Sequence, residues 1–202
     1  MNRGRRLAIA SPMILAIVLG TSGSAYQIDA SALSLTRESN KSTSITPKIS
    51  KQSIPMNRSI PTRIQIPSLN LDSRLMKLGL LKNGSLQVPP TAFPAGWYTG
   101  SPTPGEMGPS IIAGHIDWNG PGVFYNLNKM RLGDRISIAR ADGSTASFVV
   151  TRMASFLKRD FPTEAVYGDL NHPGLRLITC GDYDFTRHKY IRDLVVFAKL
   201  IS

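Results

Sequence analysis

The sequence predicts an all-β fold, a compact β-barrel or β-sandwich of about eight short strands with one or two short helical segments. Short runs such as residues 62–67 alternate polar and apolar side chains, as half-buried strands do. Asn83-Gly84 and Asp142-Gly143 are strong hairpin signals, because these residue pairs tolerate the positive φ of tight turns. Helical periodicity is almost absent, which argues against a helical fold.

The expected strands are separated by turn residues at most of their boundaries. In chain order they are residues 62–67, 74–80, 85–88, 110–116, 135–141, 146–153, 175–180 and 194–201. The second and third strands form one hairpin through Asn83-Gly84, and the fifth and sixth form another through Asp142-Gly143. Gly181 and Asp182 are expected to begin a turn directly after the seventh strand.

Three segments between these strands are expected to be irregular or helical. Residues 91–108 are rich in Pro and Gly, which predicts a loop. Residues 123–130 predict a short helix, because Phe124, Leu127 and Met130 recur on one side of it. Residues 161–167 are expected to form a helical turn.

The chain divides into three parts by composition. Residues 1–28 carry arginines, then an apolar run and then small residues, which is the order found in an export signal or N-terminal membrane anchor. Residues 29–60 are rich in Ser, Thr and Lys and predict a flexible spacer. Residues 61–202 are long enough for one domain with a single core. Whether the leader is cleaved or retained, the bulk of the chain is expected outside the cytoplasm, with the N-terminus inside if it is retained.

The chain is strongly basic, with a formal net charge of +11 at pH 7. Such a charge suits an anionic membrane surface or an acidic cell-wall polymer. Nucleic acid is a poor partner, because export removes the protein from it and no basic stripe with interleaved aromatics occurs. One Cys and three scattered His give no ligand pair at zinc spacing, so neither a metal nor a cofactor is expected.

Cys180 is the single cysteine of the chain and stands at the expected end of the strand 175–180. By residue type alone, a lone cysteine is more often a small buried apolar residue. In an exported protein it has no internal disulfide partner, so a reactive thiol or an intermolecular bond has to be considered. A strand end beside a turn would hold such a thiol firmly while leaving one side open to substrate.

His115 and Arg192 are the residues expected to act with this thiol. His115 follows Gly114 at the end of another buried strand, which suits a Cys–His pair, although an isolated histidine there is more often structural. Arg192 precedes the last strand and shares the alternation of Leu194, which favours an inward-leaning guanidinium that stabilises an oxyanion. Arg187 is the second candidate, and a solvated turn is the simpler alternative for both arginines.

Several segments together resemble the sortases, the cysteine transpeptidases of bacterial surfaces. They are residues 62–67, 95–98, 104–117, 120–125, 132–135, 177–181 and 190–198, in the family's order. The elements Ala-Gly-His-Ile-Asp and Leu-Ile-Thr-Cys-Gly, with Gly-Pro-Gly-Val-Phe-Tyr, are most similar to class F. Class F members often have a second glycine where this chain has Asp182. The resemblance implies an eight-stranded closed sortase-type β-barrel, an N-terminal membrane anchor, and His115 and Cys180 as the catalytic pair, with Arg192 as the expected arginine.

The resemblance also implies a reaction and its partners. Cys180 would cleave a Leu-Pro-x-Thr-Gly (LPxTG) type sorting-signal peptide of a surface protein after its Thr and hold the product as a thioester. An amine, such as that of a peptidoglycan stem peptide or another protein's lysine, would accept the acyl group. Two alternatives remain: another secreted cysteine acyl-transferase or peptidase, such as an L,D-transpeptidase, and a non-catalytic wall-binding β-barrel.

Overall fold

The computed structural model describes residues 53–202, so the expected leader and most of the expected spacer lie outside the described residues. It contains the strands β1 (Pro61–Ile66), β2 (Leu71–Leu78), β3 (Ala95–Tyr98), β4 (Gly108–Ala113), β5 (Arg135–Arg140), β6 (Thr145–Leu157), β7 (Pro173–Asp184) and β8 (Lys189–Leu200). The helical segments are η1 (Pro67–Leu69), η2 (Leu127–Lys129), η3 (Lys158–Asp160) and α1 (Thr163–Tyr167). Among these residues, no helix has both the length and the apolar character that crossing a membrane requires.

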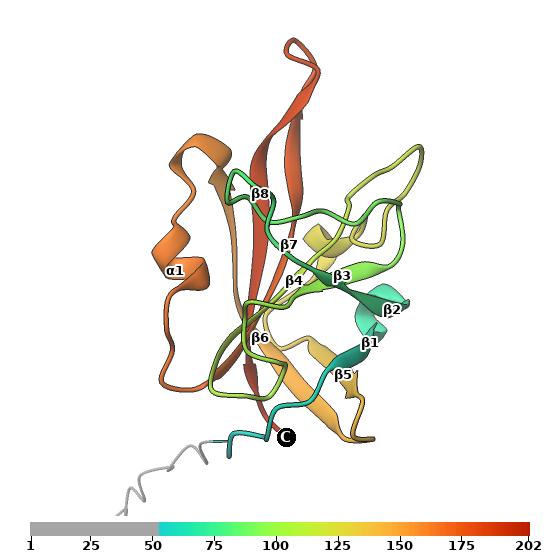
Figure 1. Cartoon of the computed structure of the whole chain (residues 1–202). Helices are drawn as coiled ribbons and strands as arrows, with labels where there is room; N and C mark the ends of the chain where they lie inside the picture. Colours follow the sequence, from blue (N-terminus) through green and yellow to red (C-terminus); the bar gives the residue numbers. More distant parts are fainter. Residues whose placement is uncertain (1–52) are drawn as a thin grey trace, which may run out of the picture. The chain divides into compact units, whose positions relative to one another are not determined.

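The strands close into a barrel in the order β1-β2-β3-β4-β7-β8-β6-β5 (Figure 1). This confirms the eight-stranded closed barrel and rules out the sandwich. Most neighbours are antiparallel, but β2 pairs with β3 and β4 pairs with β7 in parallel. The parallel pair of β4 and β7 matters for the site, since it brings the C-terminal ends of two strands far apart in sequence to the same rim.

Two apolar clusters stabilise the barrel from opposite faces of its wall. The interior cluster includes Ile112, Leu177 and Val196, each fully buried. The outer cluster contains Ile178 and Val195 and is covered in part by α1, which contributes Val166, while Phe161 packs against it. Successive side chains of a strand alternate between these faces, so both sides of the β7–β8 pair are packed at this level.

The segment between β2 and β4 differs from the expectation in two ways. Residues 85–88 form no return strand; Leu80 and Leu86 share only an isolated bridge. Residues 91–108, expected as a loop, contain β3, whose pairing partners are distant strands and not a local hairpin. Gly96 within β3 is required by packing, because a Cβ there would lie 2.3 Å from the Leu78 side chain. Pro and Gly were therefore misleading signals for a loop here.

The expected helix at 123–130 reduces to the three-residue η2. Phe124, Leu127 and Met130 are nevertheless all buried in the interior cluster. Their spacing thus predicted burial correctly and helix wrongly. The strands expected at 135–141 and 146–153 correspond to β5 and β6, and the helical turn at 161–167 corresponds to α1, although β6 continues to Leu157.

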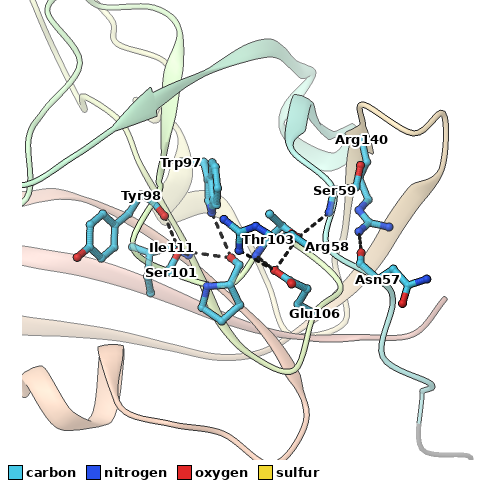
Figure 2. Close-up of polar contacts among 11 residues, drawn as sticks. Asn57, Arg58, Ser59, Trp97, Tyr98, Ser101, Thr103, Glu106, Ile111 and Arg140 are labelled. Carbon is cyan, nitrogen blue, oxygen red and sulfur yellow. Dashed lines mark hydrogen bonds and ion pairs between the residues drawn. The ribbon is translucent and has the colours of Figure 1, made fainter.

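A polar network fixes the base of the barrel (Figure 2). The Ser59 backbone N–H donates to Thr103 Oγ1 at 3.1 Å, and Glu106 accepts from the Thr103 N–H at 2.5 Å. Trp97 Nε1 donates to the Pro102 carbonyl at 3.2 Å. Arg140 donates to the carbonyl of Asn57. These bonds order the connection from β3 to β4 and hold residues 57–59, which precede β1, against the barrel.

The β7–β8 pair is longer than the sequence predicted. β7 does not stop at Cys180 but continues through Asp184, where it pairs with Lys189 of β8. The turn expected at Gly181-Asp182 is therefore wrong, and the chain turns after Asp184 instead. The hairpin projects past the rest of the barrel (Figure 1). β7 continues because its ladder with β8 skips Asp182, whose φ is 52°, and resumes at Tyr183, so pairing overrides the local turn preference of Gly181.

Candidate active site

Cys180 lies on β7 just beyond the point where β4 ends. The last β4 pair is Ala113 with Ile178, so at Cys180 the strand keeps only its β8 neighbour, Asp193. The thiol is free and partly exposed. Alternation along β7 puts Cys180 on the outer face together with Ile178, not in the barrel interior.

His115 comes two residues after the end of β4, at the same rim. The chain between β4 and His115 needs a glycine at position 114, because a Cβ there would lie 2.5 Å from Val123 Cγ1 and 2.8 Å from Phe124 Cδ2. The chain therefore passes close to Val123 and Phe124 at Gly114. His115 Nε2 donates to the Pro89 carbonyl at 2.7 Å, and its ring lies 4.8 Å from the Trp118 ring, centroid to centroid. Because a carbonyl only accepts, Nε2 carries the proton in this conformation.

A cleft of about 810 Å³ brings the two predicted residues together. His115 and Cys180 both line it, although they are far apart in the sequence. The parallel pairing of β4 with β7 produces this meeting, since both strands end toward the same rim. Residues 84–89 of the long connection between β2 and β3 form another wall, and Phe161, Thr163 and Tyr167 close the side near α1.

Arg192 is not among the residues that line this cleft. It pairs with Gly181 on β7 and therefore lies on the face opposite that of Cys180. Its guanidinium donates to the hydroxyl of Ser155 at 3.0 Å and to the carbonyl of Ser155 at 2.9 Å, and it forms an ion pair with Asp182 at 3.3 Å. The predicted alternation with Leu194 holds, but it carries Arg192 to the interior face and away from the sulfur.

Arg187 lies near the tip of the β7–β8 hairpin. It forms an ion pair with Asp184 at 2.9 Å, and its side chain is 67% exposed. It is not among the residues that line the cleft. Its geometry is that of a solvated turn.

Lys158 and Asp193 enter the cleft without having been singled out from the sequence. Lys158 Nζ lies 3.6 Å from Cys180 Sγ and 2.5 Å from Asp193 Oδ1. The alternation of residues 192–198 alone favours Arg192 as the inward-facing residue. The register between β7 and β8 instead sets Asp193 directly opposite Cys180.

The surroundings of Cys180 act on its ionisation in opposite directions. Burial raises the pKa of the thiol, and the charges of Asp193 and Asp117 act the same way, while the ammonium group of Lys158 opposes them. The net effect is a pKa above the ordinary value of 9.0. The Tyr190 hydroxyl donates to Asp117 at 2.6 Å, and burial together with this bond raises the pKa of Tyr190.

The arrangement thus offers a nucleophile, an acid–base group and a cation on one cleft, which is the equipment for acyl transfer. Within residues 53–202, no three His, Cys, Asp or Glu side chains gather in a way that would hold a metal ion.

Solved structures with similar folds are sortases. Sortase A from Corynebacterium diphtheriae superposes with a TM-score of 0.54 at 23% identity, over 72% of this chain and 62% of that chain. Sortase C1 from Streptococcus agalactiae gives 0.57 at 20% identity, over 70% and 67%. A sortase D5 transpeptidase from Clostridium perfringens gives 0.53 at 22% identity, over 71% and 79%. The chain thus spans less than two thirds of the Corynebacterium protein. At identities this low, the likeness to these structures shows the fold alone.

The sequence comparison covers nearly all of the barrel. No curated protein sequence matches the chain. Residues 64–201, however, match the family described as Sortase domain, and this range contains both His115 and Cys180. Sortases are cysteine transpeptidases, so the expected enzyme class is confirmed at the level of the family. The chain belongs to the sortase family.

Proposed function

We propose that this protein is an extracytoplasmic cysteine transpeptidase that cleaves an LPxTG-type sorting signal after its Thr and transfers the product to an amine. The observation that carries the proposal is the shared cleft of Cys180 and His115, within a domain of the sortase family. A peptide carbonyl held in this cleft has a thiol beside it at one wall and an imidazole at another. Thiol and imidazole together are the groups that acyl transfer at an amide requires.

The reaction proceeds in two steps through a thioester. The Cys180 thiolate attacks the carbonyl carbon of the Thr–Gly bond, and the tetrahedral intermediate collapses as the C–N bond breaks. His115 gives a proton to the leaving amine. An incoming amine then loses a proton to His115, attacks the thioester carbonyl and releases the thiolate. No net oxidation occurs, and one amide bond replaces another.

His115 has to exchange one hydrogen bond to take this role. Its Nε2–H now donates to Pro89, which belongs to the wall formed by residues 84–89. An arriving substrate nitrogen competes with that carbonyl for the imidazole. Since catalytic hydrogen bonds often form only in the complex with substrate, the bond to Pro89 is compatible with an acid–base role.

Arg192 is part of the proposal as the oxyanion donor expected from the resemblance. In the present conformation its partners are Ser155 and Asp182. Its side chain is 32% exposed, and the proposal requires that it leaves these partners and reaches the cleft when substrate binds. The position of Arg192, one residue before Asp193, the β8 partner of Cys180, supports this role.

The finer assignments rest on the sequence. The Ala-Gly-His-Ile-Asp and Leu-Ile-Thr-Cys-Gly elements support class F membership, and the arginines and apolar run of residues 1–28 support an anchor in the membrane or a cleaved leader. The acceptor is an amine of the cell wall, such as a peptidoglycan stem peptide, or a lysine of another protein. The basic character of the chain suits work at an anionic wall or membrane surface.

Mass spectrometry of the intact enzyme tests this function. The full chain is incubated with an LPxTG peptide, with a muropeptide, or with neither, and quenched in acid. We expect an acyl-enzyme on Cys180 with the LPxTG peptide alone, and its conversion to an amide when an amine is added. The Cys180→Ala variant is the matched control and acquires no mass. An acyl-enzyme formed from the muropeptide would instead indicate an L,D-transpeptidase, and none with either would indicate a wall-binding barrel.

A further inference from the structure

The cation in contact with the sulfur, Lys158, belongs to η3, which directly follows a strand that carries none of the predicted site residues. β6 pairs with β8 up to Leu157, opposite Arg192, and η3 begins at the next residue. Lys158 therefore leaves the sheet at the level of the hairpin and lines the cleft. Its Nζ approaches Cys180 Sγ to 3.6 Å, within hydrogen-bonding range of a sulfur acceptor.

Asp193 holds the ammonium group in this place. Its Oδ1 lies 2.5 Å from Lys158 Nζ, and its backbone pairs with Cys180 across β7 and β8. The carboxylate and the thiol thus point to the same face, and one ammonium group bridges them. The side chain of Asp193 is 19% exposed and that of Lys158 is 41% exposed, so water screens this pair in part.

We propose that Lys158 is a catalytic group that stabilises the thiolate of Cys180, and that Asp193 is the positioning residue that holds its ammonium group against the sulfur. This inference deepens the proposed function and rests on it for the identity of the nucleophile. In this assignment Lys158 is the cation beside the thiol, and Arg192 has the separate role of stabilising the oxyanion. The two positive groups then stabilise two different negative charges, the thiolate and the oxyanion, at different stages of the reaction.

The electrostatic argument depends on what surrounds the sulfur. Burial is the largest influence on the pKa of Cys180 and raises it, and the charges of Asp193 and Asp117 add to this effect. Both influences that lower the pKa of the thiol, a charge and a hydrogen bond, come from Lys158. Burial also disfavours the charged form of Lys158, but the bond and charge of Asp193 and the charge of Cys180 outweigh it and raise the pKa of the lysine above 10.5. The surroundings of Lys158 thus favour its charged form, which is the form that attracts a thiolate.

The titratable groups around Cys180 come from several elements. They are Lys158 of η3, Asp193 and Tyr190 of β8, and Asp117 and His115 after β4. Without Lys158, the carboxylates and burial all favour the neutral thiol. Loss of the ammonium group is expected to leave less thiolate at neutral pH and so to slow every reaction of the sulfur.

Alkylation of the full chain by iodoacetamide measures the thiolate directly. Because Cys180 is the single cysteine, each alkylation event reports on it. The rate is recorded against pH for the wild type, Lys158→Met, Lys158→Arg and Arg159→Gln. Arg159 is the matched control, since it is the neighbouring cation, 79% exposed and paired with Asp160. Circular dichroism and thermal unfolding verify that each variant is folded.

We expect Lys158→Met to react on the order of 10-fold more slowly at neutral pH, with a profile displaced toward higher pH. Lys158→Arg restores the rate, and Arg159→Gln matches the wild type. A Lys158→Met profile that superposes on the wild type would overturn the proposal, as would a folded Lys158→Arg variant that behaves like Lys158→Met. The assay needs no peptide, so it tests Lys158 even if no LPxTG peptide is cleaved, in which case only the proposed function fails.

Discussion

The two halves of the β7–β8 pair show how one sheet provides both stability and chemistry. In the lower half, residues 174–178 of β7 lie between β4 and β8 and are buried on both faces. In the upper half, β4 has ended, and residues 180–184 keep β8 as their neighbour and are partly or fully exposed. Cys180 stands at the start of the upper half, where β7 still has a rigid ladder on one side and has an open edge on the other.

This difference explains why the site forms at this rim. A strand paired on both sides has no free backbone groups and no room for a substrate. A strand held on one side leaves space beside the nucleophile, while the ladder with β8 keeps the nucleophile in place. His115 arrives at the same level because β4 ends there and Gly114 lets the chain pass close to Val123. The predictions below test this division, from the largest expected effect to the smallest.

Near the upper half, Lys158 and Arg192 are assigned two different roles, and Arg192→Ala tests whether these roles are separate. We expect kcat/KM for an LPxTG peptide to fall on the order of 10²–10³-fold, as for the loss of other oxyanion donors. The alkylation rate of Cys180 should stay unchanged, because Arg192 lies on the face opposite the sulfur. Arg187→Ala is the control and should keep its activity, since that side chain pairs with Asp184 near the hairpin tip. Full activity in Arg192→Ala would remove Arg192 from the mechanism.

Leu177→Ala tests the lower half. Leu177 is fully buried in the interior cluster, so its truncation leaves a cavity and should lower the free energy of unfolding by about 3 kcal/mol. Tyr183→Ala is the counterpart on the same strand in the upper half, where the side chain is 39% exposed, and should cost less than about 1 kcal/mol. Urea denaturation followed by fluorescence gives both values. Equal losses would mean that side chains in the two halves contribute equally to the free energy of unfolding.

Gly114→Ala tests the junction between the halves. The added Cβ would meet Val123 at 2.5 Å, so we expect a loss of about 1–3 kcal/mol in unfolding free energy and a displaced His115 with lower kcat. Gly181→Ala is the matched control, because a Cβ there has its nearest contact at 3.8 Å, to the Leu194 backbone. Thermal unfolding and peptide cleavage measure the two effects. If both variants unfold alike, Gly114 does not set the position of His115.

The ionisation of Cys180 gives the smallest effect. Burial raises the pKa of the folded thiol above 9.0, so the unfolded chain releases its proton at lower pH than the folded chain does. The sign follows: stability should decline as pH rises from about 8 to 10, because the unfolded state binds fewer protons there. Cys180→Ala should lack this component of the decline. A constant difference between the two proteins across this range, measured by urea denaturation, would contradict it.

Much of this fold is visible in the sequence because local signals and tertiary pairing agree. Residues 62–67, 135–141 and 146–153 alternate as half-buried strands and form β1, β5 and β6. β3 escaped prediction because its Pro and Gly suit a loop, and only its pairing with β2 and β4 makes it a strand. The end predicted for β7 was wrong for the converse reason, since the ladder with β8 carries the strand past Gly181.

The sequence by itself determined the composition of this site: one thiol, one histidine after a buried strand, and a cation near the last strand, all in an all-β domain. The tertiary structure decided which of them meet. Alternation along a strand defines two faces, but only the register between β7 and β8 says that Cys180 shares its face with Asp193 while Arg192 lies on the other. The strand register and the end of β6 likewise bring Lys158 to the sulfur. No pattern within the sequence predicts this contact between Lys158 Nζ and Cys180 Sγ.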